Sequence, residues 1–186
     1  MWRLFSMLGR KRALPVQITV THPAAAKMFR IAQRALPNES GGVLIGTCSE
    51  TGALISVTVG PGPKALHGPT SFTRDGEYAQ LHVERHRRQS PGQLDYVAEW
   101  HSHPLPCAPS PTDSASMRAI SRSPEYRRPI PLLVLCILAS SGAWELRGYT
   151  YRGRRLQEVA LVITDAETSG SEEAGHCNTE PGSRAE

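Results

Sequence analysis

Residues 99–113, EWHSHPLPCAPSPTD, join the pattern of a strand to the pattern of a helix start. On a strand, residues two apart point to the same face, so His101 and His103 project together. Ser110 and Asp113 stand at the cap and the third position of a helix start, with a proline between them. Because the proline-stiffened turn before Ser110 is short, we expect Asp113 to lie beside the two histidines.

This cluster has the composition of a zinc site. Two histidines and one carboxylate form a three-ligand set for Zn²⁺ that leaves a fourth position for water. Each part also has a simpler interpretation: His-x-His can be two polar residues at a strand end, and a helix cap accounts for Ser110 and Asp113 without a metal. A helix cap does not explain why the helix start follows so closely after the HSHP segment. The stretch therefore favours one zinc ion per chain, bound by His101, His103 and Asp113.

Outside this stretch, strands and helices alternate along the chain. Apolar runs and alternation predict strands, and a 3.6-residue period predicts helices. The expected strands are residues 16–21, 42–46, 54–59, 96–103, 130–139, 143–151 and 156–164. The expected helices are residues 24–36, 76–88 and 112–120, and residues 60–69, GPGPKALHGP, are expected to be an irregular loop. This order predicts an α/β (α+β) fold with a largely antiparallel sheet flanked by helices.

The composition changes at both ends of the chain. Residues 1–15 include GRKR and predict a basic leader, and residues 16–164 have the length of one domain. Residues 165–186 contain six acidic residues, one arginine and no large apolar side chain, which predicts a disordered acidic tail. The tail has a net charge of −5, and the other 164 residues carry 20 basic and 11 acidic side chains, a net +9.

The composition also disfavours several classes of protein. The longest apolar run, residues 130–139, is too short to cross a bilayer, so no membrane partner is expected. Cys48, Cys107, Cys136 and Cys177 form no CxxC pair, which disfavours a disulfide framework and favours a reducing cytoplasm. The basic body permits nucleic-acid binding, but no basic stripe interleaved with aromatic residues accompanies it, so no nucleic-acid partner is expected.

A metal hydrolase also needs a base that is not a metal ligand. Glu39, in NESGGVLIG, precedes a strand and is followed by two glycines, which let backbone or substrate approach closely. Glu99 competes for this role because it shares the strand face of the two histidines, where it could also be a partner behind the ligands or an ion-paired acid. Cys107 lies in the turn, either as a small side chain or as a thiolate fourth ligand.

These segments resemble the JAMM (MPN+) metalloprotease motif, and its prokaryotic JAB branch most closely. The motif runs Glu, then His-x-His-Pro, then Ser-x-x-Asp, and the matching residues are Glu39, His101, His103, Ser110 and Asp113. The resemblance extends over roughly residues 16–164. One departure is that six residues separate His103 from Ser110, where the family commonly has seven, and a loop shortened by one residue would shift Ser110 more than Asp113.

The resemblance implies a cytidine-deaminase-like MPN/JAB domain with a curved, mostly antiparallel sheet, and it implies that Glu39 activates the water. Ser110 would then hydrogen-bond the developing oxyanion or steady the water, and Glu99 would stand behind the ligands. Cys107, from its position in the turn, is another candidate for a place behind the ligands. The implied activity is hydrolysis of an amide or isopeptide bond after the C-terminal tail of a ubiquitin-like protein, in deconjugation or precursor processing. A bacterial antiphage or conjugation operon is a fitting setting, with the ubiquitin-like protein or its conjugate as the partner of a monomer or weak dimer.

Two other functions stay open at this point. Many MPN proteins lack the metal set and act as binding scaffolds, although every motif position is filled in this chain. Some JAB relatives are suspected to act on DNA, which the basic body permits and the lack of a DNA-binding motif disfavours.

Overall fold

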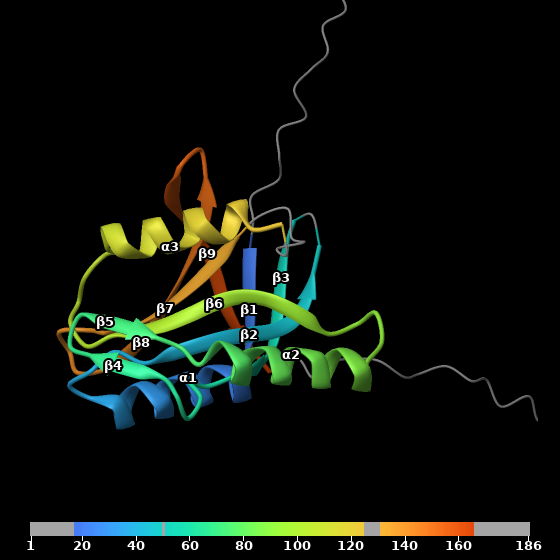
Figure 1. Ribbon diagram of the computed structural model, residues 1–186. Coiled ribbons are helices and arrows are strands. Elements are labelled where there is room, and N and C mark those ends of the chain that lie inside the picture. Colours follow the sequence, from blue (N-terminus) through green and yellow to red (C-terminus); the bar gives the residue numbers. More distant parts are fainter. Residues whose placement is uncertain (1–16, 50, 125–130, 166–186) are drawn as a thin grey trace, which may run out of the picture.

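The computed structural model describes residues 17–49, 51–124 and 131–165, so residues 1–15 and all of the predicted tail after Asp165 lie outside it. Figure 1 shows the arrangement. The elements are β1 (Gln17–Thr21), α1 (His22–Ala35), β2 (Gly41–Cys48), β3 (Gly52–Thr58), β4 (Leu66–Gly68), β5 (Ser71–Thr73), α2 (Gly76–Gln89), β6 (Asp95–His103), α3 (Pro111–Arg122), β7 (Leu132–Leu138), β8 (Trp144–Arg152) and β9 (Arg155–Thr164).

Seven of these strands close into a barrel in the order β1-β3-β2-β6-β7-β8-β9. Among the described strands of the barrel, four pairings are antiparallel, and three are parallel: β1 with β3, β1 with β9, and β6 with β7. The predicted α/β fold is therefore confirmed. Its sheet is more mixed than predicted, because β1 inserts between β3 and β9 in parallel to both.

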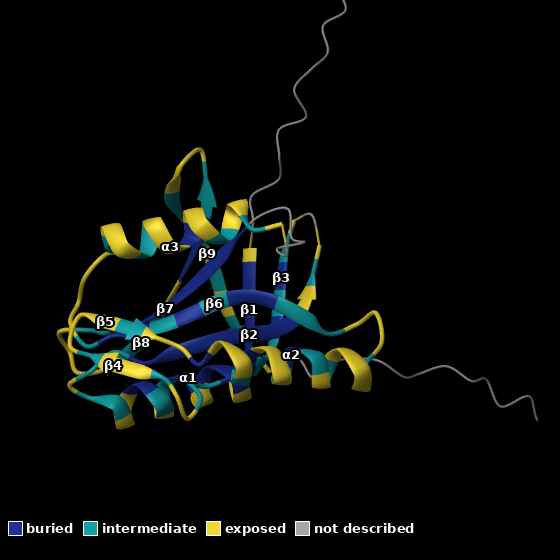
Figure 2. Cartoon of the chain, in the orientation of Figure 1, coloured by how far each residue is buried: buried dark blue, intermediate teal, exposed yellow. Residues whose placement is uncertain are grey.

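The two faces of the sheet pack against different helices. Along β7, Val134 belongs to the cluster formed with α1, whereas Leu133 and Leu135 belong to the cluster formed with Met117 of α3. This alternation follows from the period of two along a strand. α2 packs separately on β2, and its contacts with β2 involve Ala79, Val83, Val43 and Ile45. Figure 2 shows the central strands as the most buried part and the outer helix faces as exposed.

Local signals explain where the helices begin. Asp75 caps α2, because its carboxylate accepts a hydrogen bond from the N–H of Tyr78 at 3.1 Å. α1 begins at His22, two residues earlier than predicted, with a proline in its first turn, where the missing N–H costs nothing. No helix among the described residues is long and apolar enough to span a membrane.

The prediction of an irregular loop over residues 60–69 is wrong for its last part. Leu66–Gly68 form β4, which pairs with β5 in a small antiparallel hairpin. Three-residue strands are too short to show an alternating pattern in the sequence. The hairpin is joined to the segment before β2, because the N–H of Glu39 donates to the carbonyl oxygen of Gly68 at 2.8 Å.

Candidate metal centre

The end of β6 carries both histidines of the motif. β6 lies between β2 and β7 in the sheet, and its alternate residues Trp100 and Ser102 are buried on the opposite face. The indole N–H of Trp100 donates to the Val59 carbonyl at 2.9 Å, and the Ser102 hydroxyl oxygen accepts from the N–H of Ser40 at 2.9 Å. These bonds fix the strand end, so that His101 and His103, which alternate with Trp100 and Ser102, project together from the other face.

Three side chains converge at this strand end. The Nε2 atom of His101 lies 3.0 Å from Nε2 of His103 and 3.1 Å from Oδ1 of Asp113. Nε2 of His103 lies 3.6 Å from Oδ2 of Asp113. A tetrahedral zinc ion with bonds of about 2.1 Å places its ligand atoms about 3.4 Å apart. The spacing therefore fits a zinc ion, and no other group of three such side chains has this closeness in the described part of the chain.

The protonation of these groups also suits a cation. Burial, and then the charge of His101, lower the pKa of His103, which favours the neutral imidazole that a metal requires. Burial alone would raise the pKa of Asp113. Hydrogen bonds and charge from His101, with the hydrogen bonds from Ser110, outweigh it and lower the pKa to about 2. Asp113 is therefore a carboxylate at neutral pH.

The start of α3 positions Asp113. The N–H of Asp113 donates to the Ser110 hydroxyl at 3.1 Å, and the N–H of Ser110 donates to Oδ2 of Asp113 at 2.6 Å. These two bonds form the predicted capping box, with Pro111 as the first helical residue. The cap and the metal cluster are thus compatible, since one carboxylate oxygen serves the cap and the other contacts His101.

Glu39 lies in the same cavity as the three ligands, as the motif led us to expect. Its pKa is raised mainly by burial and further by the Asp113 carboxylate, against an opposing effect of His101. The two glycines that follow allow close packing at this point. A Cβ atom on Gly41 would lie 2.3 Å from the carbonyl oxygen of Trp100 and 2.7 Å from Cβ of His101.

His67 is a residue of this site that the sequence did not reveal. Its Nδ1 atom lies 2.9 Å from the carbonyl oxygen of Glu39, in addition to the bond between Glu39 and Gly68. The β4–β5 hairpin therefore holds Glu39 through two backbone contacts. The order of the residues gave no signal for this, because His67 and Glu39 are 28 positions apart in a stretch without a recognisable motif.

Cys107 contacts the other side of His103. Its Sγ atom lies 3.0 Å from Nδ1 of His103, whereas Nε2 of that ring faces Asp113. Cys107 is also absent from the ligand cluster. The geometry thus favours a partner behind the ligand over the alternative of a thiolate fourth ligand, and burial raises the pKa of the thiol.

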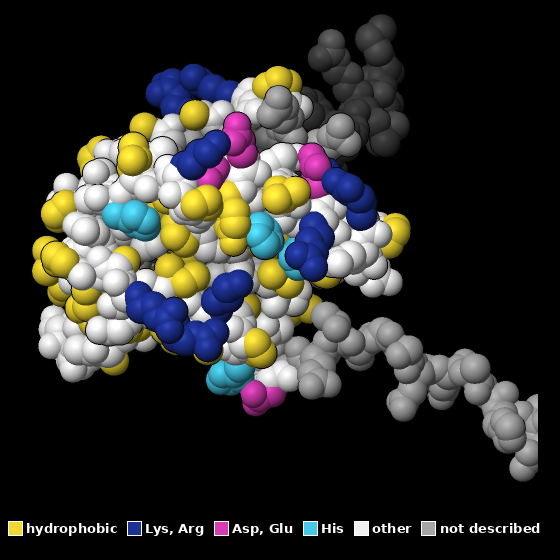
Figure 3. Space-filling view, turned by 60° about the horizontal axis from the view of Figure 1, so that its bottom comes forward, with side chains coloured by type: hydrophobic (Ala, Val, Ile, Leu, Met, Phe, Trp, Pro, Cys, Tyr) yellow, Lys and Arg dark blue, Asp and Glu magenta, His cyan; other side chains and the backbone are white. Residues whose placement is uncertain are grey.

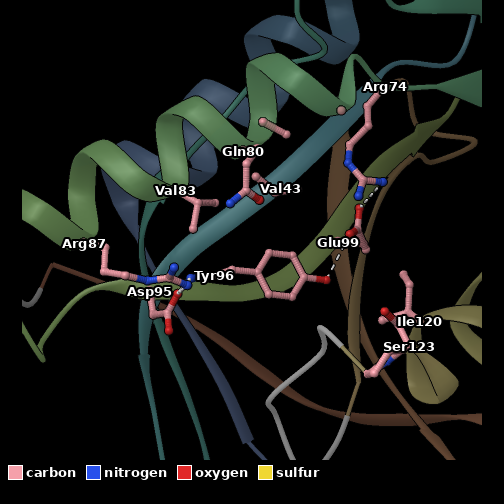
Figure 4. Close-up of a pocket in the computed structure, with 13 residues that line it drawn as sticks. Val43, Arg74, Gln80, Val83, Arg87, Asp95, Tyr96, Glu99, Ile120 and Ser123 are labelled. Atoms are coloured by element: carbon pink, nitrogen blue, oxygen red, sulfur yellow. Dashed lines mark hydrogen bonds and ion pairs between the residues drawn. The ribbon is translucent and has the colours of Figure 1, made fainter.

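The second candidate base, Glu99, is occupied by other contacts. It forms an ion pair with Arg74 at 3.1 Å and accepts a hydrogen bond from the Tyr96 hydroxyl at 2.9 Å, as Figure 4 shows. Burial raises its pKa, against the effects of Arg74 and Tyr96. Glu99 also borders two cavities, the one with the ligands, of about 740 Å³, and one of about 780 Å³ alongside α2. Arg74 and Glu99 therefore stand where these two cavities meet.

The motif geometry agrees with comparison to known proteins. A family described as prokaryotic homologues of the JAB domain matches residues 21–150. The chain belongs to the prokaryotic JAB family. The family resemblance is thus confirmed over most of the domain, and the matched region includes residues 101–113.

Named relatives of this JAB domain are metalloproteases and isopeptidases. A probable metalloprotease from Sinorhizobium fredii is 35% identical over 126 residues, which cover 66% of this chain and 76% of the relative. A CD-NTase/cGAS isopeptidase from Enterobacter hormaechei is 32% identical over 152 residues, covering 77% of this chain and 82% of the relative. The predicted enzyme class, a JAB-type metalloprotease or isopeptidase, is confirmed at this level.

A solved structure supports the same JAB fold. The solution structure of a protein from Desulfitobacterium hafniense superposes with a TM-score of 0.64 at 20% identity. The match covers 81% of this chain and 95% of that protein. At this identity the comparison bears on the fold alone.

Proposed function

We propose that the chain is a zinc-dependent isopeptidase that hydrolyses the amide or isopeptide bond after the C-terminal tail of a ubiquitin-like protein. The observation that carries the proposal is the convergence of His101, His103 and Asp113 at ligand spacing, with Glu39 in the same cavity. A zinc ion held by these ligands would polarise the scissile carbonyl and make a water molecule easier to deprotonate.

The remaining chemistry belongs to Glu39 and Ser110. Glu39 accepts the proton of the attacking water and delivers it to the leaving amine as the C–N bond breaks. Its raised pKa brings it closer to neutral pH, where a group that accepts and returns a proton works best. The Ser110 hydroxyl accepts from the N–H of Asp113, so its own O–H remains able to donate to the oxyanion.

The walls of the ligand cavity suit an extended peptide. Ser71, Phe72 and Thr73 of β5 line one side, and Met117 and Ile120 of α3 line another. In the described part of the chain β5 pairs only with β4, so its second edge is available to backbone groups of a substrate. A glycine-rich tail could therefore be held by strand addition.

A relative's name suggests the class of conjugate. The Enterobacter hormaechei protein is a CD-NTase/cGAS isopeptidase, and we propose a ubiquitin-like conjugate of a CD-NTase-type acceptor for this chain as well. This assignment fits an antiphage operon. The cysteines in the described residues are free, as in enzymes of a reducing cytoplasm.

The test combines cleavage with metal analysis. The probe is a CD-NTase that carries a ubiquitin-like protein through an isopeptide bond, and its cleavage is followed by intact mass. Glu39→Gln should lose at least about 100-fold in activity, because a general base contributes about that much or more. Zinc content, measured by elemental analysis, should remain near one per chain. Glu158→Gln, which removes an exposed acid of β9, is the matched control and should retain activity.

Two results would contradict the proposal. Full activity of Glu39→Gln would exclude Glu39 as the base. A folded wild-type chain that takes up no zinc when the metal is supplied would favour a binding scaffold, and His103→Ala would then have no metal to lose.

A further inference from the structure

α1 and α2 together present a surface that we call the basic face. Its members are Lys27, Arg30 and Arg34 of α1 and His82, Arg85 and His86 of α2. The three α1 residues share one side of the helix by their spacing, and α1 has no acidic residue. Figure 3 brings this side of the molecule forward. Its middle and lower parts carry Lys, Arg and His side chains, and acidic side chains lie in the upper part and at the lower margin.

A small cavity joins the two helices within the basic face. It has a volume of about 230 Å³, and Lys27, His82, Arg85 and His86 line it without any carboxylate among the lining residues. The ring of His82 lies 4.4 Å from that of Tyr78 and 6.4 Å from that of His86, between centroids. Burial lowers the pKa of His82, and the charges of His86, Lys27 and Arg85 lower it further. Lys27 and Arg85 therefore bring positive charge to a cavity that no carboxylate lines.

The cations next to this face are paired with carboxylates, unlike those within it. Their ion pairs are Lys64–Glu77 at 2.6 Å, Arg87–Asp95 at 2.5 Å and Arg88–Glu84 at 3.2 Å. Within the described residues, none of the ion pairs involves Lys27, Arg30, Arg34 or Arg85. The basic face is thus the part of these two helices that is open to an anionic ligand.

The acidic segment of the chain itself begins beside this surface. Oδ1 of Asp165 lies 3.4 Å from Nε2 of His22, the first residue of α1. Residues 166–186 contain five glutamates and one arginine. A chain of this length can reach about 70 Å when extended, whereas α1 is about 21 Å long. The segment is therefore long enough to contact the basic face along the whole of α1.

We propose that residues 166–186 bind in cis to the basic face, with glutamate carboxylates paired to Lys27, Arg30, Arg34 and Arg85. Single exposed ion pairs are weak, but tethering gives the segment an effective concentration in the millimolar range. The inference goes beyond the proposed hydrolytic function and does not depend on it.

Lysine placement allows a direct test on the full chain. The sequence has only Lys11, Lys27 and Lys64, and a zero-length carbodiimide joins an amine to a carboxylate in contact with it. We expect a Lys27–glutamate link to residues 166–186 in the monomer, identified by peptide mass spectrometry. Its yield should fall severalfold at about 0.5 M salt, where ionic contacts are screened. The Lys64–Glu77 link serves as the internal control for the reaction.

Matched variants decide whether the basic face is responsible. Arg30→Gln, Arg34→Gln and Arg85→Gln together should lower the Lys27 link severalfold. The control removes three exposed arginines elsewhere, Arg118→Gln, Arg122→Gln and Arg154→Gln, and should leave the yield unchanged. The proposal is overturned if the Lys64 link forms without any Lys27 link, if the two triple variants behave alike, or if isotope-mixed chains show the link only between two copies.

Retention on heparin provides an independent measurement. Replacing the five glutamates of residues 166–186 by glutamine should raise the salt concentration at which the full chain elutes, because the basic face would be uncovered. The increase should disappear in the Arg30, Arg34 and Arg85 variant. An increase of the same size in both backgrounds would show that the segment acts only through net charge, and would overturn binding to this face.

Discussion

At the scale of single residues, the role of a side chain depends on which atom of its neighbour it contacts. Cys107 stands in the sequence among metal ligands, yet its sulfur lies against Nδ1 of His103 and not against the ligand cluster. If Nε2 of His103 binds a metal, Nδ1 must carry the proton and donate it to Sγ. Cys107 then fixes the orientation and tautomer of the ligand, as groups behind metal-bound histidines commonly do.

This arrangement leads to a prediction for Cys107. Cys107→Ala removes the acceptor and should weaken zinc binding by about 10-fold or more, the usual effect of losing such a partner. Cys107→Ser keeps an acceptor and should bind zinc more tightly than the alanine variant. Competition with a zinc-binding dye measures both affinities. Equal affinities for wild type, serine and alanine variants would show that the contact with His103 has no such role, and Cys48→Ala is the control for loss of a thiol.

The clustering of the three candidate ligands could be predicted from the sequence, and some of the contacts that support it could not. His101, His103 and Asp113 follow from short-range rules, namely the period of two on a strand and the spacing of a helix cap. His67 supports Glu39 only because a hairpin folds back on the segment before β2. Short-range patterns carry no information on such a contact.

At the scale of elements, the sequence predicted every strand of the barrel and all three described helices. Each of these elements is long enough for its apolar residues to repeat in a recognisable pattern. It did not predict the closure of the barrel. β1 lies between β3 and β9 in parallel to both, and the pairing of Ile18 with Leu161 joins residues from opposite ends of the domain. Nor did it predict β4 and β5, whose three residues each leave no periodic signal.

The contact between β2 and β6 leads to a prediction for Gly41. A Cβ atom there would overlap the Trp100 carbonyl and Cβ of His101, so Gly41→Ala must push the two strands apart beside the metal centre. We expect a loss of roughly 1–3 kcal/mol in the free energy of unfolding, as for other overpacked sites, together with reduced zinc content. Gly76→Ala, at a position with open space in α2, is the control.

Denaturant titration and elemental analysis measure these two effects. The Gly76 variant should match the wild type or exceed it, since alanine favours a helix over glycine. A Gly41→Ala protein with wild-type stability and zinc content would mean that close approach of the strands is not required for the site.

At the scale of the whole molecule, the candidate ligand cluster joins the end of β6 to the start of α3. Two ligands come from the sheet and one from α3, which contacts the sheet mainly through Met117. Binding a metal to the folded form alone stabilises it by mass action. Without metal, the same three side chains remain close together, and their ionisation then affects global stability.

The stability of the metal-free chain should therefore fall on acidification in two ranges. The pKa of His103 is lowered in the folded state, so the unfolded chain binds more protons as the pH drops below about 6.5 and stability declines. The pKa of Asp113 is about 2 in the folded state against 3.8 for the free group, so its contribution is complete above 3.8 and is lost as the pH falls through 2. That contribution is roughly 2 kcal/mol.

Denaturant midpoints of the chelator-treated protein between pH 7 and pH 2 measure both declines. Asp75 and Glu84 also have lowered pKa values, so the wild type loses stability below pH 4 for more than one reason. The difference between wild type and Asp113→Asn isolates Asp113, because the variant keeps an acceptor for the Ser110 N–H. We expect the two curves to converge as the pH falls from 4 to 2. Parallel curves over that range would show that the contacts of Asp113 with His101 and Ser110 do not stabilise its charge in the absence of metal.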